Sequence, residues 1–276
     1  MAARPIMRRF ADLAHGQMHY REAGTGEVLL AFHASPGSSR QMVGLMAQFA
    51  GAMRVIAPDT PGNGDSDALP LEAPDISDLA AAMLALLDRL EIERAHLYGS
   101  HTGAAIAAEL TLLAPERVLS VTFDGVGHWE GAELAEALAL YAQPFAPDLD
   151  GIYLGRLFTF CRNQFLFYPW YRETEAARRT GELPPPESLH GLVTEVMKAA
   201  TTYHRNYHAA FRWDAPGRLP QLEVPALFMA SESDPLFADT RRLAGKHSFA
   251  ALPTLGDPAY AKARHAAMTR FLAKST

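Results

Sequence analysis

A tight turn between a strand and a helix is predicted at Gly99-Ser100-His101-Thr102-Gly103. The run 96–98 leads into this turn as a strand, and residues 102–114 follow it with helical spacing. The glycines lie two positions before and two positions after His101, where strand and helix backbones must pass close together. The function of the chain therefore depends on what an imidazole does at this turn.

Short apolar runs alternate with helical patterns along the rest of the chain. Strands are expected at 16–22, 28–32, 55–57, 96–98, 118–123, 225–230 and 249–252. Helices are expected at 41–49, 79–90 (capped by Ser77 or Asp78), 102–114 and 258–274, and a hairpin turn at 24–26. This alternation predicts an α/β fold, a doubly wound and mostly parallel sheet with right-handed crossovers.

Residues 126–219 interrupt the alternation. The segment is rich in aromatic residues, contains Pro184-Pro185-Pro186 and lacks a strand pattern. We interpret it as a helical cap inserted into one α/β core. The predicted division is residues 1–125 and 220–276 for the core and residues 126–219 for the cap.

Composition narrows the classes of function. The net charge is −6 with both signs scattered, which gives no electrostatic case for nucleic acid or an anionic membrane. Cys161 is the single cysteine, so neither a disulfide framework nor a thiolate metal cluster is expected. His204 and His208 have a zinc-compatible spacing but lack a third ligand. We expect a cytoplasmic protein with no signal peptide, a small-molecule substrate and no metal or cofactor, and a homodimer remains open.

Polar segments follow five of the predicted strands. They are 33–39, 59–67, 100–102, Asp124 and 231–234. In doubly wound sheets, ligands bind outside the carboxyl ends of the strands. The five segments are therefore expected to meet at one site.

These segments resemble motifs of the α/β-hydrolase superfamily, in its capped branch of epoxide hydrolases, haloalkane dehalogenases and C–C hydrolases. His33-Ala34-Ser35-Pro36-Gly37 is similar to the oxyanion loop, and 59–67 is similar to the D-x-P-G-x-G-x-S segment. Residues 99–103 resemble the nucleophile elbow G-x-S-x-G with the nucleophile changed. The resemblance covers nearly the whole chain.

The resemblance implies roles for several residues. Asp234 matches the usual position of the catalytic acid, and Asp124 matches the alternative acid position. The backbone N–H groups of Ser35 and Thr102 would form an oxyanion hole. Two departures stand out: His101 occupies the nucleophile position, and Gly256-Asp257 replaces the Gly-His pair that supplies the catalytic histidine.

A histidine at the elbow is best suited to proton transfer. The positive potential at a helix N-terminus is expected to lower the pKa of His101 and keep it neutral, a usable general base. Asp124 or Asp234 would fix its tautomer. The reactions left open are water attack on an ester, lactone or epoxide, proton abstraction or C–C cleavage next to a carbonyl, and decarboxylation.

Competing interpretations remain at each position. A catalytically inactive ligand-binding protein would also tolerate His101, and a serine hydrolase using Ser100 is a third alternative. His33, Ser100 and Asp257 are candidate binding residues. For His33 a hydrogen bond that shapes its loop is favoured, and for Asp257 a helix cap before Pro258. Asp124 and Asp234 could also serve as turn residues.

Overall fold

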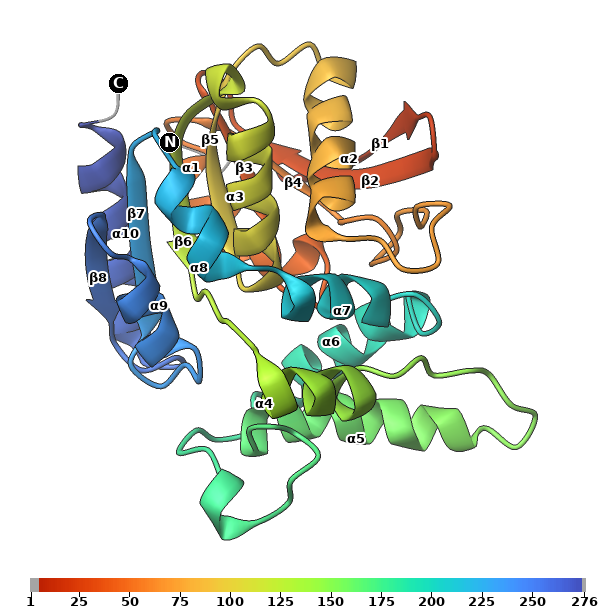
Figure 1. Cartoon of the computed structure of the whole chain (residues 1–276). Helices are drawn as coiled ribbons and strands as arrows, with labels where there is room; N and C mark the ends of the chain where they lie inside the picture. The colour runs from red at the N-terminus through yellow and green to blue at the C-terminus, as the bar shows by residue number, and fades with distance from the viewer. Residues whose placement is uncertain (1–4, 275–276) are drawn as a thin grey trace.

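The computed structural model describes residues 5–274 and places one eight-stranded sheet between helical layers (Figure 1). The strands are β1 (Met7–Leu13), β2 (Gly16–Ala23), β3 (Val28–Phe32), β4 (Arg54–Pro58), β5 (Ala95–Ser100), β6 (Val118–Asp124), β7 (Ala226–Ser231) and β8 (Ser248–Leu252). Their order is β1-β2-β4-β3-β5-β6-β7-β8. The pairs β1–β2 and β2–β4 are antiparallel and the remaining pairs are parallel. The predicted doubly wound, mostly parallel sheet is confirmed.

Helices cover both faces of the sheet. The longer ones are α1 (Val43–Phe49), α2 (Ile76–Arg89), α3 (Thr102–Leu113), α9 (Phe237–Leu243) and α10 (Pro258–Leu272). In β3, Leu30 and Phe32 pack in the core that includes α2 and α3, and Leu29 and Ala31 pack in the core that includes α1 and α10. Burial on both faces explains why this strand is a continuous apolar run.

The inserted region is helical, and most of its helices lie at one end of the sheet (Figure 1). It contains α4 (Gly131–Glu136), a π-helix at Ala137–Tyr141, α5 (Ile152–Leu166), α6 (Pro186–Lys198), α7 (His204–Arg212) and α8 (Ala215–Arg218). Its interior is a separate aromatic cluster around Phe160 and Tyr203. Helix α8 packs in the main core, together with the sheet. The predicted cap limits at 126 and 219 remain a prediction. Among the helices of residues 5–274, none combines the length and apolarity needed to cross a bilayer.

Two local expectations were wrong, and one strand was not predicted. Strand β1 was not foreseen, because it is an edge strand whose residues are mostly exposed and do not alternate. Strand β2 pairs with β1 and β4 rather than forming a hairpin at 24–26. Helix α2 is capped by Asp75, whose carboxylate accepts from the N–H groups of Ser77 and Asp78, and Asp78 completes a capping box.

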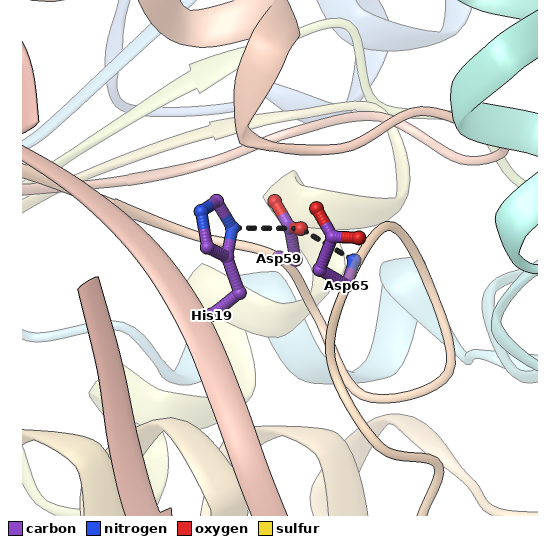
Figure 2. Close-up of side chains that lie close together, drawn as sticks. All are labelled: His19, Asp59 and Asp65. Carbon is purple, nitrogen blue, oxygen red and sulfur yellow. Dashed lines mark hydrogen bonds and ion pairs between the residues drawn. The ribbon is translucent and has the colours of Figure 1, made fainter. Parts of the chain in front are cut away.

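Asp59 connects three separate parts of the core, and Figure 2 shows two of its contacts, with His19 and Asp65. Its carboxylate accepts hydrogen bonds from His19 Nδ1 at 2.9 Å, from the N–H of Ser39 at 2.7 Å and from the N–H of Asp65 at 2.8 Å. Burial disfavours ionisation, but the bond from His19 and the two backbone donors outweigh it and hold the pKa of Asp59 below its usual range. The carboxylate thereby fixes β2, the loop after β3 and its own turn.

The same cluster offers ligand atoms that lie within 4.8 Å of one another on His19, Asp59 and Asp65. Both carboxylate oxygens of Asp59 already accept hydrogen bonds from the protein. Gly64 has a φ of +55°, and a Cβ there would collide with the Asp59 carboxylate. The segment 59–67 is therefore a closed structural turn, which explains its aspartate and its glycine in physical terms.

Replacement of Asp59 by alanine should lower the free energy of unfolding by about 3 kcal/mol, because three buried donors lose their acceptor. The wild type should also lose this contribution as the pH falls below about 4 toward the lowered folded-state pKa, since the stabilisation needs the ionised carboxylate. Urea titrations at pH 7 and at acidic pH measure both effects.

Asp65→Asn provides the matched control, because it loses only a half-exposed ion pair with Lys198 and keeps the backbone N–H that binds Asp59. It should cost under about 1 kcal/mol. Equal losses in the two variants would contradict the role assigned to Asp59.

Candidate active site

The turn between β5 and α3 presents His101 at the carboxyl edge of the sheet. His101 has a φ of +50°, and its N–H donates to the carbonyl oxygens of Asp124 and Gly125, both at 3.1 Å. A Cβ at Gly99 would collide with the backbone of Gly103, and a Cβ at Gly103 would lie 2.5 Å from the carbonyl oxygen of Phe32. The two glycines are therefore required by close backbone approach, as the sequence spacing predicts.

The imidazole of His101 is bound directly by Asp234, in the loop after β7. His101 Nε2 lies 2.7 Å from Asp234 Oδ2. The histidine side chain is 37% exposed and the aspartate side chain 14%. With Nε2 carrying the hydrogen that Asp234 accepts, Nδ1 is the ring's unprotonated nitrogen. Within residues 5–274, no hydrogen bond involves Nδ1, so this atom has no protein partner in the described part of the chain.

Gly125 sets the position of this ring. A Cβ on Gly125 would lie 2.5 Å from Cδ2 and 2.7 Å from Nε2 of His101, and the glycine has a φ of +80°. The edge of the ring that carries Nε2 thus lies against Gly125 and Asp234.

The expectation of a lowered His101 pKa was wrong. Burial disfavours the imidazolium, but the charge and hydrogen bond of Asp234 outweigh it and hold the pKa of His101 above its usual 6.5. Asp234 responds in the opposite direction: burial opposes its ionisation, yet His101 keeps its pKa below the usual value. A carboxylate at 2.7 Å therefore prevails over the helix N-terminus, whose effect is under about 1 kcal/mol at most sites.

Asp124 does not bind the imidazole. Its carboxylate accepts from the hydroxyl of Tyr98 at 2.6 Å and from the hydroxyl of Tyr260 at 3.2 Å. Burial raises the pKa of Asp124, although the hydrogen bond from Tyr98 and the charge of Arg264 oppose that rise. The structure thus brings Asp234, and not Asp124, to the ring of His101.

The two predicted oxyanion donors line the same cavity as His101. Ser35 and Thr102 both border it, and within the described part of the chain neither backbone N–H has an acceptor. The loop that carries Ser35 is held by bonds from Ala34 N–H to the Gln41 side chain at 3.0 Å and from Gly37 N–H to the Ala34 carbonyl at 2.9 Å. Thr102 opens α3, where the helix adds a positive potential.

The remaining candidates differ in their contacts. His33 is fully buried outside the cavity: its Nδ1 lies 3.0 Å from the carbonyl oxygen of Ala34 and its Nε2 accepts from the N–H of Thr60 at 3.0 Å. Burial lowers the pKa of His33, which favours the neutral imidazole, and its hydrogen bonds connect two loops. Ser100 and Asp257 border the cavity, and Asp257 also caps α10 through the N–H of Ala259 at 2.7 Å.

The cavity beside His101 has a volume of about 900 Å³. The inserted helices and loops supply most of its aromatic lining, which includes Trp129, Tyr141, Phe165, Tyr168, Phe211 and Trp213. One cationic side chain, Arg179, also borders it, and sequence reasoning missed this residue because no local pattern marks it. The site can hold a small, largely apolar molecule against an imidazole base and two free N–H donors.

Comparisons with known proteins agree with this architecture. The family model described as alpha/beta hydrolase fold matches residues 27–249. The 2-hydroxy-6-oxononadienedioate/2-hydroxy-6-oxononatrienedioate hydrolase 2 of Pseudomonas putida is 34% identical over 263 residues, covering 86% of this chain and 84% of that protein.

Two further matches support less, because one covers a small part of each chain and the other has low sequence identity. The acetyltransferase component of an acetoin cleaving system from Pseudomonas putida is 40% identical over 101 residues, which are 37% of this chain and only 26% of that protein. The crystal structure of epoxide hydrolase A from Mycobacterium thermoresistibile has a TM-score of 0.72 at 22% identity, covering 98% of each chain. At that identity the structural likeness concerns the fold alone.

Removal of the charge at Asp234 should lower the pKa of His101. In the wild type, NMR titration of the His101 ring should give a pKa above 6.5, and Asp234→Asn should bring it below the wild-type value. Asp257→Asn is the control, since Asp257 borders the cavity without bonding to the ring. An unchanged titration in Asp234→Asn would show that the 2.7 Å contact does not control the imidazole.

Substitution of Gly125 by alanine should displace the ring of His101, because the added Cβ meets Cδ2 and Nε2 and the positive φ disfavours any L side chain. The same titration should then show the His101 pKa moving down, as in Asp234→Asn. A variant with the wild-type titration would mean that the ring is not held against Gly125.

Proposed function

Because the chain belongs to the α/β-hydrolase fold family, we propose that it is a hydrolase that acts on a small, largely apolar ester, epoxide or carbonyl compound with His101 as its general base. The observation that supports this proposal is the arrangement at the elbow. An imidazole held by Asp234 borders a cavity that is also lined by Ser35 and Thr102, whose N–H groups have no acceptor within residues 5–274. Base and oxyanion donors therefore border one cavity.

For an ester the proposed reaction has two proton transfers. His101 Nδ1 takes a proton from a water molecule as the water oxygen attacks the carbonyl carbon, and the carbonyl oxygen becomes an oxyanion. The N–H groups of Ser35 and Thr102 stabilise that negative charge. The tetrahedral intermediate then collapses, the bond to the leaving oxygen breaks, and Nδ1–H returns the proton to the leaving group. Asp234 stabilises the imidazolium between the two steps.

This mechanism does not use a serine nucleophile. The resemblance to the α/β-hydrolase superfamily implies a histidine after the last strand that would activate a serine hydroxyl. In this chain Asp257 occupies that position and caps a helix. Ser100 borders the cavity but comes one residue before the elbow position. Direct water activation accounts for His101 without requiring a second histidine.

C–C bond cleavage next to a carbonyl is a second candidate. One observation favours it: the Pseudomonas putida relative, which matches most of this chain, is named a hydrolase of 2-hydroxy-6-oxo dienedioates. The raised pKa of His101 also suits it, because an imidazolium could deliver a proton to a carbon before water attack. A β-diketone substrate distinguishes this reaction from ester cleavage by its products.

Replacement of His101 by alanine should lower kcat/KM by about 10²- to 10⁴-fold, since the general base is lost. The test uses a panel of 4-nitrophenyl esters, epoxides and β-diketones with product detection. Ser100→Ala should retain wild-type kcat/KM, and a fluorophosphonate probe should not label the wild type. Circular dichroism confirms that both variants are folded. Full activity in His101→Ala, or labelling of Ser100, would contradict the proposed mechanism.

The pH dependence provides an independent prediction. Because the base must be unprotonated, kcat/KM should fall as the pH decreases through the His101 pKa, which lies above 6.5. In Asp234→Asn the limb should move to lower pH and the maximal rate should drop. A wild-type limb below pH 6 would contradict His101 as the titrating base. Ligand binding without turnover of any substrate would instead indicate a binding protein.

A further inference from the structure

Strand β1 leaves one edge of the sheet without a partner strand. It is the last strand on its side of the sheet and pairs only with β2, through all seven of its residues and without a bulge. Within residues 5–274, no backbone hydrogen bond from outside the sheet reaches β1. We propose that this edge pairs with the same edge of a second copy of the chain, about a twofold axis. The inference does not depend on the proposed hydrolase function.

The free edge is exposed and carries two large apolar side chains. Met7 is 49% exposed and Phe10 is 55% exposed. No proline interrupts the strand, and every residue except Ala11 is at least partly exposed. An unbulged edge of this kind pairs with another strand unless its charges oppose the pairing. A partner strand would cover both apolar side chains and bind the outward N–H and C=O groups of β1.

Backbone geometry limits the registers that two β1 strands can adopt. Along an edge strand, the N–H and C=O groups of alternate residues point outward. About a twofold axis the two strands run antiparallel, and each outward residue must oppose another outward residue. The position numbers of every opposed pair must therefore have an even sum. The candidate registers thus differ from one another in steps of two in that sum.

One of these registers matches the side chains of the two copies. When Phe10 opposes Phe10 of the second copy, Arg8 opposes Asp12 of the second copy, and symmetry repeats this ion pair at the other end. Met7 then opposes Leu13. Opposed residues of an antiparallel pair have Cβ atoms about 4.5–5.5 Å apart, so aromatic, apolar and opposite-charge pairs all contribute. The strand is thus complementary to itself, as an interface about a twofold axis requires.

The neighbouring registers lose this complementarity. With the sum lowered by two, Arg9 opposes Arg9 of the second copy and Arg8 opposes Phe10. With the sum raised by two, Phe10 opposes Asp12 and no arginine opposes a carboxylate. Like charges that are directly opposed destabilise a strand pair. The charges of β1 therefore select one register and disfavour its neighbours.

The charged side chains that this register needs are available. Within the described part of the chain, Arg8 has no ion-pair partner, whereas Arg9 is paired with Glu22 of β2 at 2.6 Å. Asp12 is exposed and accepts one hydrogen bond, from the Gln17 side chain at 2.8 Å on Oδ1. Its other carboxylate oxygen can therefore accept from a guanidinium of the second copy.

Phe10 lies on the same face of the strand as these two charges, because side chains alternate between faces. Its ring packs edge-on against His19 of β2, with the ring centroids 5.2 Å apart. That contact covers one side of the ring and leaves the outer side to a partner. Two copies of Phe10 at the twofold axis would form the apolar centre of the interface, with an ion pair on each side.

The opposite edge of the sheet lacks this pattern. Strand β8 has the sequence Ser-Phe-Ala-Ala-Leu, with no charged side chain to select a register. Its Ala251 is exposed and provides a reference position for the experiments. The self-complementary sequence thus assigns the interface to β1, and two eight-stranded sheets would become one continuous sheet.

The first experiment measures self-association of the full chain, with no residues added before Met1, by sedimentation velocity. A contact of one seven-residue strand is small, so the dimer should be weak and the titration should reach about 200 μM protein. Arg8→Asp opposes two carboxylates at both ends of the interface, and Asp12→Arg opposes two guanidinium groups. Each should raise the dimer dissociation constant about 10-fold or more.

The double variant Arg8→Asp/Asp12→Arg restores opposite charges with their positions exchanged. Its dissociation constant should return to within about threefold of the wild-type value. Arg156→Asp is the matched control, because Arg156 is exposed on α5 and has no ion-pair partner in residues 5–274. It should associate as the wild type does. Circular dichroism checks that every variant is folded. A monomeric wild type, or a dimer that both single reversals leave unchanged, would overturn the proposal.

A cross-linking experiment tests the register. Phe10→Cys places two thiols opposite each other at the twofold axis, whereas the thiols of Arg8→Cys are offset by four residues, about 14 Å along the strands. A short bismaleimide should therefore join Phe10→Cys and not Arg8→Cys or Ala251→Cys. Cys161 is buried, so the wild type gives the background. Failure of Phe10→Cys to cross-link, or equal cross-linking of Ala251→Cys, would refute pairing through β1.

Discussion

The hydrogen bond between His101 Nε2 and Asp234 Oδ2, at 2.7 Å, determines the chemistry of this site. It assigns the ring hydrogen to Nε2 and so leaves Nδ1 as the atom that can accept a proton. It also raises the proton affinity of the imidazole, despite the cost of burying a cation. The acid after β7 and the elbow after β5 lie 133 residues apart in the chain, and the parallel sheet brings them together.

That contact depends on backbone features which permit no larger side chain. Gly99 and Gly103 allow β5 and α3 to approach closely, and Gly125 leaves room for the ring of His101. On the neighbouring loop, the buried Asp59 carboxylate holds the N–H of Ser39, so the oxyanion loop is fixed from outside the cavity. The glycines and Asp59 fix the geometry, whereas the proposed mechanism assigns proton transfer to His101 and Asp234.

The sequence was most informative where a feature is local. The acid positions came from the resemblance to the α/β-hydrolase superfamily. Turn glycines and apolar strands follow from short-range sterics and burial, so the sheet and the tight turn could be predicted. The choice between Asp124 and Asp234 could not, because it depends on Tyr98 and Tyr260 occupying the Asp124 carboxylate. The direction of the His101 pKa shift was misjudged because a helix-terminus effect is local, whereas the stronger ion pair is not. Strand β1 and the position of Arg179 on the cavity were not predicted, because an exposed edge strand and a single arginine in a loop carry no periodic signal.

In the proposed mechanism the general base lies on the turn between β5 and α3, and not on the loop after the last strand. In the resemblance, the catalytic histidine lies on the segment after the last strand, where this chain has Asp257 capping α10. His101 instead belongs to the turn itself, and two carbonyl oxygens of the β6 end bind its N–H. Because His101 occupies the elbow position, the proposed mechanism places the reacting water beside its Nδ1. The aromatic side chains of the inserted region line the cavity in which that water and the substrate would lie.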